Sequence, residues 1–491
     1  MEHYDLVVIG GGPSGYAGAM RAIDFSKKVL LIEKKRIGGT GVYDGVLTSK
    51  TLWEQALKVA SIREMIPDYI PRFDDFAKIV NEAVFERKTQ MTVHLQLLQK
   101  LQKKLFFYEK GTAYISNKNE VRITKEDGTS RFVSCDNILI ATGSSPRKPA
   151  NIEVDEKIIV TSDGMRNLSS FPKSLVVLGA GVIGCEFATI FSAFGQTKVY
   201  LIDKADRILP FEDEDIASIV TKNLEAQGAH VHHGASLKRM EVKNGQVEYE
   251  LEFKDGHTEV FTVEKALISI GRGANVNGLG LENAGIKMNT RGGIWNDDTQ
   301  TNVSNIYVAG DVTTDVALVN VGEREARHAV VRMYGPTVKP LSYKNISTIM
   351  FLNPEVAAVG MSEQELVAKG IAHKVVKLDY ATNARAIAMR KTAGFFKIIV
   401  TNDNGMRILG MRVIGEHASS AIQAVAYLIY TNQGIRELAD MMHPHPSIIE
   451  GVQECLRMLL NKSIYKPYVF TDRLKCYVCE NGVCTPVKSL V

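Results

Sequence analysis

The feature that most constrains the fold of this chain is a strand–turn–helix unit that its sequence contains twice. In the first copy, an apolar strand over residues 6–9 leads into the turn GGGPSG (10–15), a helix of small residues and a strand over 29–32. In the second copy, a strand over 175–178 leads into GAGVIG (179–184), a helix over 185–194 and a strand over 199–202. Gly-x-Gly-x-x-Gly between a strand and a helix is typical of βαβ units that bind dinucleotides. Two such units predict an α/β fold that holds two dinucleotides.

Each glycine of the turn has a separate role in such a site. Gly10 permits the tight turn, Gly12 lets the backbone approach a pyrophosphate, and Gly15 lets the helix pack closely on the strand. The N-terminus of the helix adds positive potential and free N–H donors. The second turn repeats the pattern with Gly179, Gly181 and Gly184.

An acidic residue closes the second strand of each unit, Glu33 in the first and Asp203 in the second. A carboxylate at this position accepts hydrogen bonds from the ribose hydroxyls of a dinucleotide. It also repels a 2′-phosphate, so Asp203 favours NADH over NADPH. Lys204 and Arg207 follow closely, and their positive charge keeps NADPH open as an alternative.

Residues 37–51, IGGTGVYDGVLTSKT, resemble a segment of the flavin-dependent pyridine nucleotide–disulfide oxidoreductases, the family of dihydrolipoamide dehydrogenase and glutathione reductase. The family segment reads Gly-Gly-Thr-Cys-x4-Cys-x-Pro-Ser-Lys, and its two cysteines form a redox-active disulfide. Thr40 and Lys50 fall in register here, but Gly41 and Val46 occupy the two cysteine positions. The chain is therefore identified as a member that lacks this disulfide, similar to disulfide-less NAD(P)H quinone reductases. The run TNARA (382–386) also resembles theirs.

The same resemblance extends over residues 4–467. It is carried by the segments ILIATG (138–143), ALISIGR (266–272), TNVSNIYVAGD (301–311) and HPHPSIIE (443–450). It implies cofactor contacts for Thr40, Gly143, Gly271 and Asp311, and the Asp311 carboxylate is expected to bind the ribityl chain of FAD.

The resemblance also implies the domain organisation. We expect two Rossmann-like domains, one for FAD over 1–149 and 276–342 and one for NAD(P)H over 150–275. A C-terminal α+β domain over 343–467 is expected to form the interface of a homodimer, and a cysteine-containing tail over 468–491 is appended to it.

Four residues are candidates for catalysis. Lys50 and Glu186 occupy the positions of the family's ion pair beside the flavin, where a lysine stabilises negative charge on the reduced ring. An ordinary salt bridge between helices is the alternative. His445 and Glu450 keep the spacing of the family's histidine–glutamate pair, which comes from the partner subunit. His445 would protonate the acceptor, or it is an inherited interface residue that fills space.

These residues predict an enzyme that takes hydride from NAD(P)H, NADH in preference, through FAD to a quinone-like or other small acceptor. Gly41 is expected to leave room over the flavin for a flat molecule. The alternatives are a dihydrolipoamide dehydrogenase or disulfide reductase that uses the tail cysteines, a soluble transhydrogenase, and a flavin-binding scaffold without activity.

The tail contains Cys476, Cys479 and Cys484. Three cysteines lack the fourth ligand that a structural zinc site needs, so no metal site is predicted. A redox pair Cys476–Cys479 is one alternative, and a mobile tail with incidental thiols is the favoured interpretation. Cys135 and Cys185 are expected in the core.

Composition limits the partners. A net charge of +4 on 491 residues, without a long basic run, disfavours nucleic acid and anionic membranes. No secretory signal or membrane span is evident, so a cytoplasmic protein is expected. The stretch 73–107 reads as an amphipathic helix with Val93, Leu97, Leu98, Leu101 and Leu105 on its apolar face.

Overall fold

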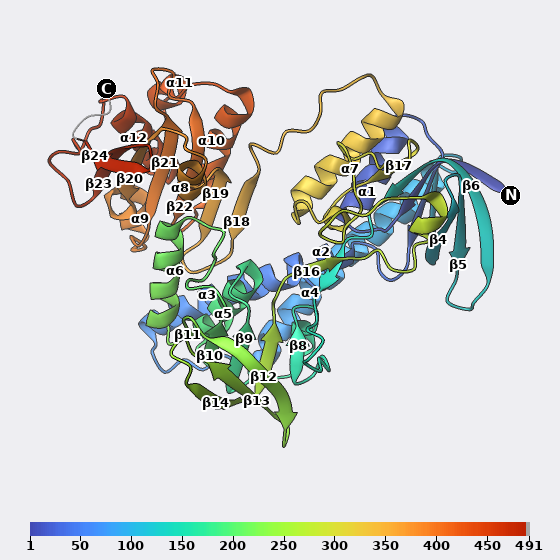
Figure 1. The fold of residues 1–491 in the computed structure, drawn as a ribbon, viewed down its shortest axis with the longest axis horizontal. Helices are drawn as coiled ribbons and strands as arrows, with labels where there is room; N and C mark the ends of the chain where they lie inside the picture. Colours follow the sequence, from blue (N-terminus) through green and yellow to red (C-terminus); the bar gives the residue numbers. More distant parts are fainter. Residues whose placement is uncertain (488–491) are drawn as a thin grey trace.

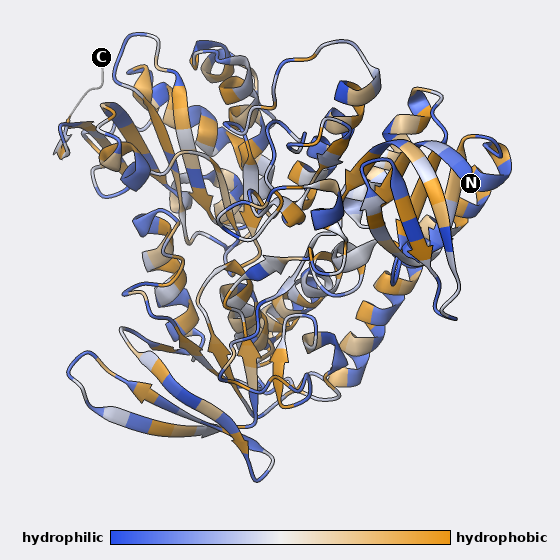
Figure 2. Cartoon of the chain, turned by 45° about the vertical axis from the view of Figure 1, so that its right-hand side comes forward, coloured by the Kyte–Doolittle hydropathy of each residue, from blue (hydrophilic) through white to orange (hydrophobic). Residues whose placement is uncertain are grey.

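A computed structural model describes residues 1–487, and its chain is built around two largely parallel sheets and one antiparallel sheet (Figure 1). Figure 2 shows that hydrophobic residues run continuously along buried strands and alternate with polar ones on exposed strands. This architecture confirms the predicted α/β class with two dinucleotide-binding units and a C-terminal α+β unit.

The first sheet has the strand order β3-β2-β1-β6-β5-β4, and β17 also pairs with β6. The carboxyl ends of β1, β2 and β6 lie level because Ile9 pairs with both Ile32 and Ile140. The glycine turn therefore emerges at one edge of the sheet. The elements are β1 (Glu2–Ile9), α1 (Pro13–Asp24), β2 (Val29–Glu33), β3 (Phe106–Lys110), β4 (Thr112–Asn117), β5 (Glu120–Thr124), β6 (Ser130–Ile140), β17 (Ile306–Val308) and α7 (Val319–Tyr334).

The second sheet repeats this arrangement with the order β11-β10-β9-β15-β8. Leu178 pairs with both Ile202 and Ile268, so the second glycine turn also leaves at the carboxyl edge. The elements are β8 (Ile159–Thr161), β9 (Ser174–Leu178), α5 (Val182–Phe194), β10 (Lys198–Ile202), α6 (Glu214–Ala226), β11 (His230–His232) and β15 (Lys265–Ile268). A three-stranded antiparallel sheet accompanies it, formed by β12 (Ser236–Lys243), β13 (Gln246–Glu252) and β14 (Thr258–Val263).

Two short strands connect the parallel sheets. β7 (Ser144–Pro146) pairs with β16 (Arg272–Ala274), close to the predicted junctions at 149/150 and 275/276. The domain boundaries themselves stay a prediction.

The third sheet is antiparallel, with the order β18-β19-β22-β21-β20-β23-β24. Its last two strands come from the tail, and β23 pairs with β20 from Leu474 to Cys479. The prediction of a mobile tail is therefore wrong for residues 474–486, because their backbone and their apolar side chains complete this sheet. The elements are β18 (Ser347–Met350), β19 (Val356–Gly360), α8 (Glu363–Ala368), β20 (His373–Asp379), α9 (Ala384–Ala388), β21 (Phe395–Thr401), β22 (Ile408–Ile414), α10 (Ser419–Thr431), α11 (Arg436–Asp440), α12 (Ile449–Leu459), β23 (Leu474–Glu480) and β24 (Val483–Pro486).

The long helix exists, but its buried face differs from the prediction. α4 spans Phe73–Leu101 and packs against α3 (Val46–Met65) and the first sheet. Met91 and Leu95 are buried, whereas Val93, Leu97 and Leu101 are exposed. Apolar residues recur every four positions on both sides of this helix, so periodicity did not identify the side that meets the sheet. Within residues 1–487, no helix is long and apolar enough to cross a membrane.

Candidate active site

The first glycine turn has the geometry that its sequence pattern predicts. Gly10 has φ 107°, and a Cβ there would lie 2.3 Å from the Ala141 carbonyl oxygen. A Cβ on Gly15 would lie 1.8 Å from the Gly10 oxygen. At Gly12, by contrast, a Cβ would meet nothing within 4 Å. Two glycines thus close the turn, and the third leaves open space over it for a phosphate group.

The second turn reproduces these contacts. Gly179 has φ 104°, and a Cβ on Gly184 would lie 2.0 Å from the Gly179 oxygen. A Cβ on Gly181 would meet nothing within 4 Å. The helices that follow, α1 and α5, begin without a side-chain cap, so their first N–H groups are available to a ligand. Both turns fit a dinucleotide pyrophosphate.

Each acidic residue is held at its turn in the same way. Glu33 Oε2 accepts the N–H of Gly11 at 2.7 Å, and Asp203 Oδ2 accepts the N–H of Ala180 at 2.7 Å. Each carboxylate thus lies at the turn itself, where we expect the ribose. The Arg207 guanidinium donates to the carbonyl oxygens of Leu209, Pro210 and Glu212, and the preference for NADH stays a prediction.

Lys50 and Glu186 form the ion pair that was expected. Lys50, on α3, donates to Glu186 Oε2 on α5 at 2.7 Å. Glu186 is 5% exposed, and its other oxygen accepts the Phe351 N–H at 3.1 Å. The Lys50 ammonium also lies 4.8 Å from the centre of the Phe351 ring. Phe351 was not identified from the sequence as a site residue.

The loop with the replaced cysteines lies against the first glycine turn. Thr40 lies in a short helix, α2 (Gly39–Val42), and a Cβ on Gly39 would be 3.2 Å from the Gly12 Cα. A Cβ on Gly41 would be 2.9 Å from Pro13 Cγ. The room expected beside Gly41 is therefore not found in that direction, because the Pro13 ring occupies it. Val46 begins α3 and is exposed.

A third group of residues gathers where the two parallel sheets meet. The Ser144 hydroxyl donates to Asp311 Oδ2 at 2.6 Å, and Arg272 Nε donates to the Ser144 oxygen at 2.8 Å. Ser144 and Arg272 were not selected from the sequence, but each directly follows a marker glycine, Gly143 and Gly271. Both glycines have positive φ, 68° and 100°, which turns the chain back at these strand ends.

His445 and Glu450 also meet, at the start of α12. Nδ1 of His445 lies 2.8 Å from Glu450 Oε1, and the Ser447 N–H donates to the other carboxylate oxygen at 2.8 Å. Burial opposes ionisation of Glu450, but these hydrogen bonds hold the pKa of its carboxyl group below the ordinary value. The His445 side chain is 71% exposed. Figure 1 shows α12 on the opposite side of the molecule from α1 and the first sheet. Within one subunit, this pair therefore does not reach the glycine turn expected to bind FAD.

The tail cysteines pair differently from the expectation. Cys479 and Cys484 form a disulfide across the β23–β24 hairpin, and Cys476 is a buried free thiol. Cys476 and Cys479 are three positions apart on one strand, so their side chains point to opposite faces of the sheet and do not form the redox pair considered above. Cys135 and Cys185 lie in the core, as expected.

This disulfide lies far along the sheet from His445. In the strand register, Cys479 lies opposite His373, at the start of β20. Asn383, just beyond the end of β20, donates to the carbonyl oxygen of Ser447, two residues after His445. The seven residues of β20 separate the two places by about 20 Å.

Comparisons with known proteins agree with this geometry. Residues 4–327 match the family model described as "Pyridine nucleotide-disulphide oxidoreductase", and residues 346–456 match its dimerisation domain. Among curated proteins, a dihydrolipoyl dehydrogenase of Bacillus subtilis is 31% identical over 94% of this chain and 99% of its own length. One from Geobacillus stearothermophilus is 32% identical over 94% of this chain and 97% of its own.

Two solved structures are similar along almost the whole chain. LpdA from Mycobacterium tuberculosis superimposes with a TM-score of 0.84 at 26% identity, over 94% of this chain and 100% of the other. The HOCl-induced flavoprotein disulfide reductase RclA from Escherichia coli does so with a TM-score of 0.81 at 27% identity, over 93% and 100% of the two chains.

Proposed function

The chain belongs to the pyridine nucleotide-disulphide oxidoreductase family, and from this premise we propose that it reduces a small quinone-like acceptor with electrons from NADH. FAD and NAD(P)H are the cofactors of this family, and the protein is accordingly an NAD(P)H-dependent flavoprotein oxidoreductase. The acceptor is the part that we propose. The dimerisation domain supports a homodimer.

The observation that carries the proposal is an intact Lys50–Glu186 pair next to a loop without thiols. Bound FAD would supply the redox chemistry, a two-electron exchange between the nicotinamide and a second substrate. Glu186 orients the Lys50 ammonium at 2.7 Å, and this fixed positive charge would stabilise negative charge on a reduced flavin beside it. Gly41 and Val46 offer no sulfur, so these residues support transfer to the acceptor without a dithiol step.

A quinone that takes up two electrons also needs two protons. We propose that the partner subunit's His445 donates one of them, since this side chain is exposed and its Nδ1 is oriented by Glu450. The Nε2 atom is then the one that faces the acceptor.

A second candidate is a disulfide reductase of the dihydrolipoyl dehydrogenase type, and the comparisons favour it over quinone reduction. The curated relatives are dihydrolipoyl dehydrogenases, and RclA is described as a disulfide reductase. The Cys479–Cys484 disulfide supplies a pair for this chemistry. This pair lies the length of β20 away from His445, the residue expected to reach the flavin of the partner subunit. For the pair to act at that flavin, β23 and β24 would have to leave the sheet.

One pair of proteins distinguishes the two candidates: the wild type and the Cys479→Ser/Cys484→Ser variant. Both are titrated anaerobically with NADH, and NADH oxidation is then measured with menadione and with lipoamide. Quinone reduction predicts that both proteins consume the same NADH per flavin. It also predicts menadione turnover well above that of free FAD, and no turnover with lipoamide.

A second equivalent of NADH in the wild type alone, together with lipoamide turnover that the variant loses, would establish the disulfide reductase instead. Flavin that NADH does not bleach in either protein would contradict both candidates.

A further inference from the structure

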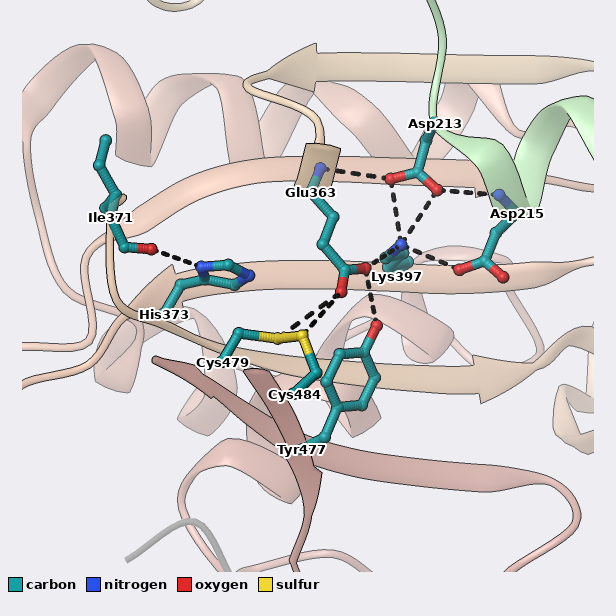
Figure 3. Close-up of a disulfide and its surroundings, with 9 residues drawn as sticks. All are labelled: Asp213, Asp215, Glu363, Ile371, His373, Lys397, Tyr477, Cys479 and Cys484. Atoms are coloured by element: carbon teal, nitrogen blue, oxygen red, sulfur yellow. Dashed lines mark hydrogen bonds and ion pairs between the residues drawn. A yellow bond between two sulfur atoms is a disulfide. The ribbon is translucent and has the colours of Figure 1, made fainter. Parts of the chain in front are cut away.

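A second cluster of reactive side chains lies at the edge of the third sheet, remote from the glycine turns. Cys479 and Cys484 meet Glu363 at the start of α8 and His373 at the start of β20 (Figure 3). Both sulfur atoms lie 3.7 Å from Glu363 Oε1. Ligand atoms of Glu363, His373 and Cys479 all lie within 4.8 Å of one another. Three elements, α8, β20 and the β23–β24 hairpin, therefore aim oxygen, nitrogen and sulfur at one point.

His373 shows that this point is suited to a ligand. The side chain is 1% exposed, and its Nδ1 lies 2.7 Å from the Ile371 carbonyl oxygen. A carbonyl only accepts, so Nδ1 carries the proton and Nε2 presents a lone pair. Nε2 has no hydrogen-bond partner within residues 1–487, and Figure 3 shows it on the side of Glu363. Metal-bound histidines have this arrangement, with one ring nitrogen tied to a carbonyl and the other free to ligate.

The Glu363 carboxylate is also held in place through one of its oxygen atoms. Its Oε2 atom contacts the Lys397 ammonium at 2.5 Å and accepts the Tyr477 hydroxyl at 2.8 Å, which leaves Oε1 directed at the sulfur atoms. Asp213 and Asp215 also contact Lys397, so carboxylates dominate this corner of the molecule. Glu363, Asp215 and Tyr477 line a pocket of about 500 Å³ that opens to the surface. The carboxylates of Asp213, Asp215 and Glu363 outnumber the two lysines that contact them, Lys397 and Lys377, which favours a cation.

We propose that opening the Cys479–Cys484 disulfide creates a binding site for a divalent metal ion of the zinc class. An external dithiol attacks the disulfide, the S–S bond breaks, and the dithiol becomes a disulfide as two electrons and two protons pass to the cysteines. The two thiols lose their protons when the metal binds. The ligands are the two sulfur atoms, His373 Nε2 and Glu363 Oε1.

This ligand set suits a tetrahedral zinc ion. Zn–S bonds of about 2.3 Å and Zn–O bonds of about 2.1 Å separate sulfur from oxygen by roughly 3.6 Å in a tetrahedral site. The sulfur–oxygen distances of 3.7 Å already match that separation. The two sulfur atoms must separate, and the Cys484 sulfur must move towards His373, because only the ligand atoms of Glu363, His373 and Cys479 already lie within 4.8 Å of one another. A covalent bond would then close the β23–β24 hairpin in the oxidised protein, and a metal ion would tie this hairpin to β20 and α8 in the reduced one.

The test uses the full-length flavoprotein in two states, oxidised and reduced with dithiothreitol that is then removed without oxygen. Zn²⁺ is titrated in competition with a chromophoric chelator, and Co²⁺ in place of Zn²⁺ reports tetrahedral thiolate ligation by its visible spectrum. We expect one ion per subunit, bound at least about 100-fold more tightly by the reduced protein. Cys484→Ser and His373→Gln should each weaken binding by about tenfold or more. His257→Gln, at an exposed histidine elsewhere, should not.

Equal affinity of the oxidised and reduced proteins would overturn the proposal, and so would a disulfide that dithiothreitol does not open in the folded protein. Wild-type affinity in Cys484→Ser would overturn it as well. That variant decides the matter if His373→Gln does not fold, because Cys484 is exposed and tolerates replacement. FAD content should be unchanged in Cys484→Ser, and the titration measures metal binding rather than turnover, so the outcome does not depend on which electron acceptor the enzyme uses.

Discussion

The ion pair between Lys50 and Glu186 is the contact that favours a flavin reductase over a flavin-binding scaffold. Glu186 is almost fully buried and has two partners, the Lys50 ammonium and the Phe351 N–H. A buried carboxylate needs such partners, because desolvation alone would make its charge unfavourable. A scaffold would have no need to keep a charged pair at this place, whereas we propose that it assists hydride transfer from NADH to a flavin.

We therefore expect Lys50→Met to slow anaerobic reduction by NADH about 100-fold, because the charge that stabilises the reduced ring is lost. Stopped-flow measurement of flavin bleaching checks this, with FAD content confirming that the cofactor is retained. Lys78→Met removes a lysine from an exposed ion pair and should leave the rate unchanged. An unaltered rate in Lys50→Met would assign the pair to structure alone.

At the scale of the element, some glycines of the turn are required for folding and another is available for ligand binding. Gly184 has no space for a side chain, since a Cβ would lie 2.0 Å from the Gly179 oxygen. Gly181 has extended backbone angles, φ −77° and ψ −170°, that any residue adopts, and open space around its Cα. Folding therefore accounts for the glycine at position 184, and we attribute the glycine at position 181 to ligand binding.

This contrast gives a prediction for two neighbouring alanine variants. Gly181→Ala should fold with wild-type stability and retain FAD, but its KM for NADH should rise about tenfold or more because the methyl group occupies phosphate space. Gly184→Ala should lose stability, since the turn and the helix must move apart. Thermal unfolding, FAD content and steady-state kinetics on both proteins check this. A normal KM in Gly181→Ala would place the NADH pyrophosphate elsewhere.

Across the whole molecule, a buried charge cluster ties the second sheet's helix α6 to the third sheet. Lys397 on β21 is 1% exposed and contacts Asp213 and Asp215, at the start of α6, at 3.0 and 2.9 Å. Burial alone would lower the pKa of Lys397, but the surrounding carboxylates raise it above the ordinary value. Lys397 therefore stays protonated. The cluster holds α6 and the third sheet together only while its carboxylates are ionised.

Asp215 makes this contact dependent on pH. Burial opposes its ionisation, but Lys397 and Lys377 lower its pKa from 3.8 to about 2. A lowered pKa in the folded state adds stability above pH 4, and this stability is lost as the pH falls towards 2. After allowance for solvent screening, the contribution is about 1–2 kcal/mol.

Asp215→Asn should accordingly lower the thermal unfolding midpoint at pH 6, and the difference from the wild type should vanish near pH 2. Asp206→Asn, from an exposed ion pair, should show little difference at either pH. A pH-independent difference for Asp215→Asn would mean that packing, not charge, accounts for its effect.

Local patterns determined the parts of this protein whose causes are local. The glycine turns, the strands around them and the acids Glu33 and Asp203 follow from backbone sterics and from the period of apolar residues, and both are visible in the sequence. Lys50 and Glu186, 136 positions apart, were paired only through the family resemblance, because no local pattern links them.

Tertiary structure decided what depends on which surfaces meet. α4 carries apolar residues on two faces, and only the position of the first sheet buries Met91 and Leu95 rather than Val93 and Leu97. The partner of Cys479 depended on the strand direction, which points Cys476 into the core and Cys484 across the hairpin. His373 and Glu363 became candidate ligands because β20 and α8 begin beside that hairpin. Such coincidences arise from long-range packing, and sequence spacing does not record them.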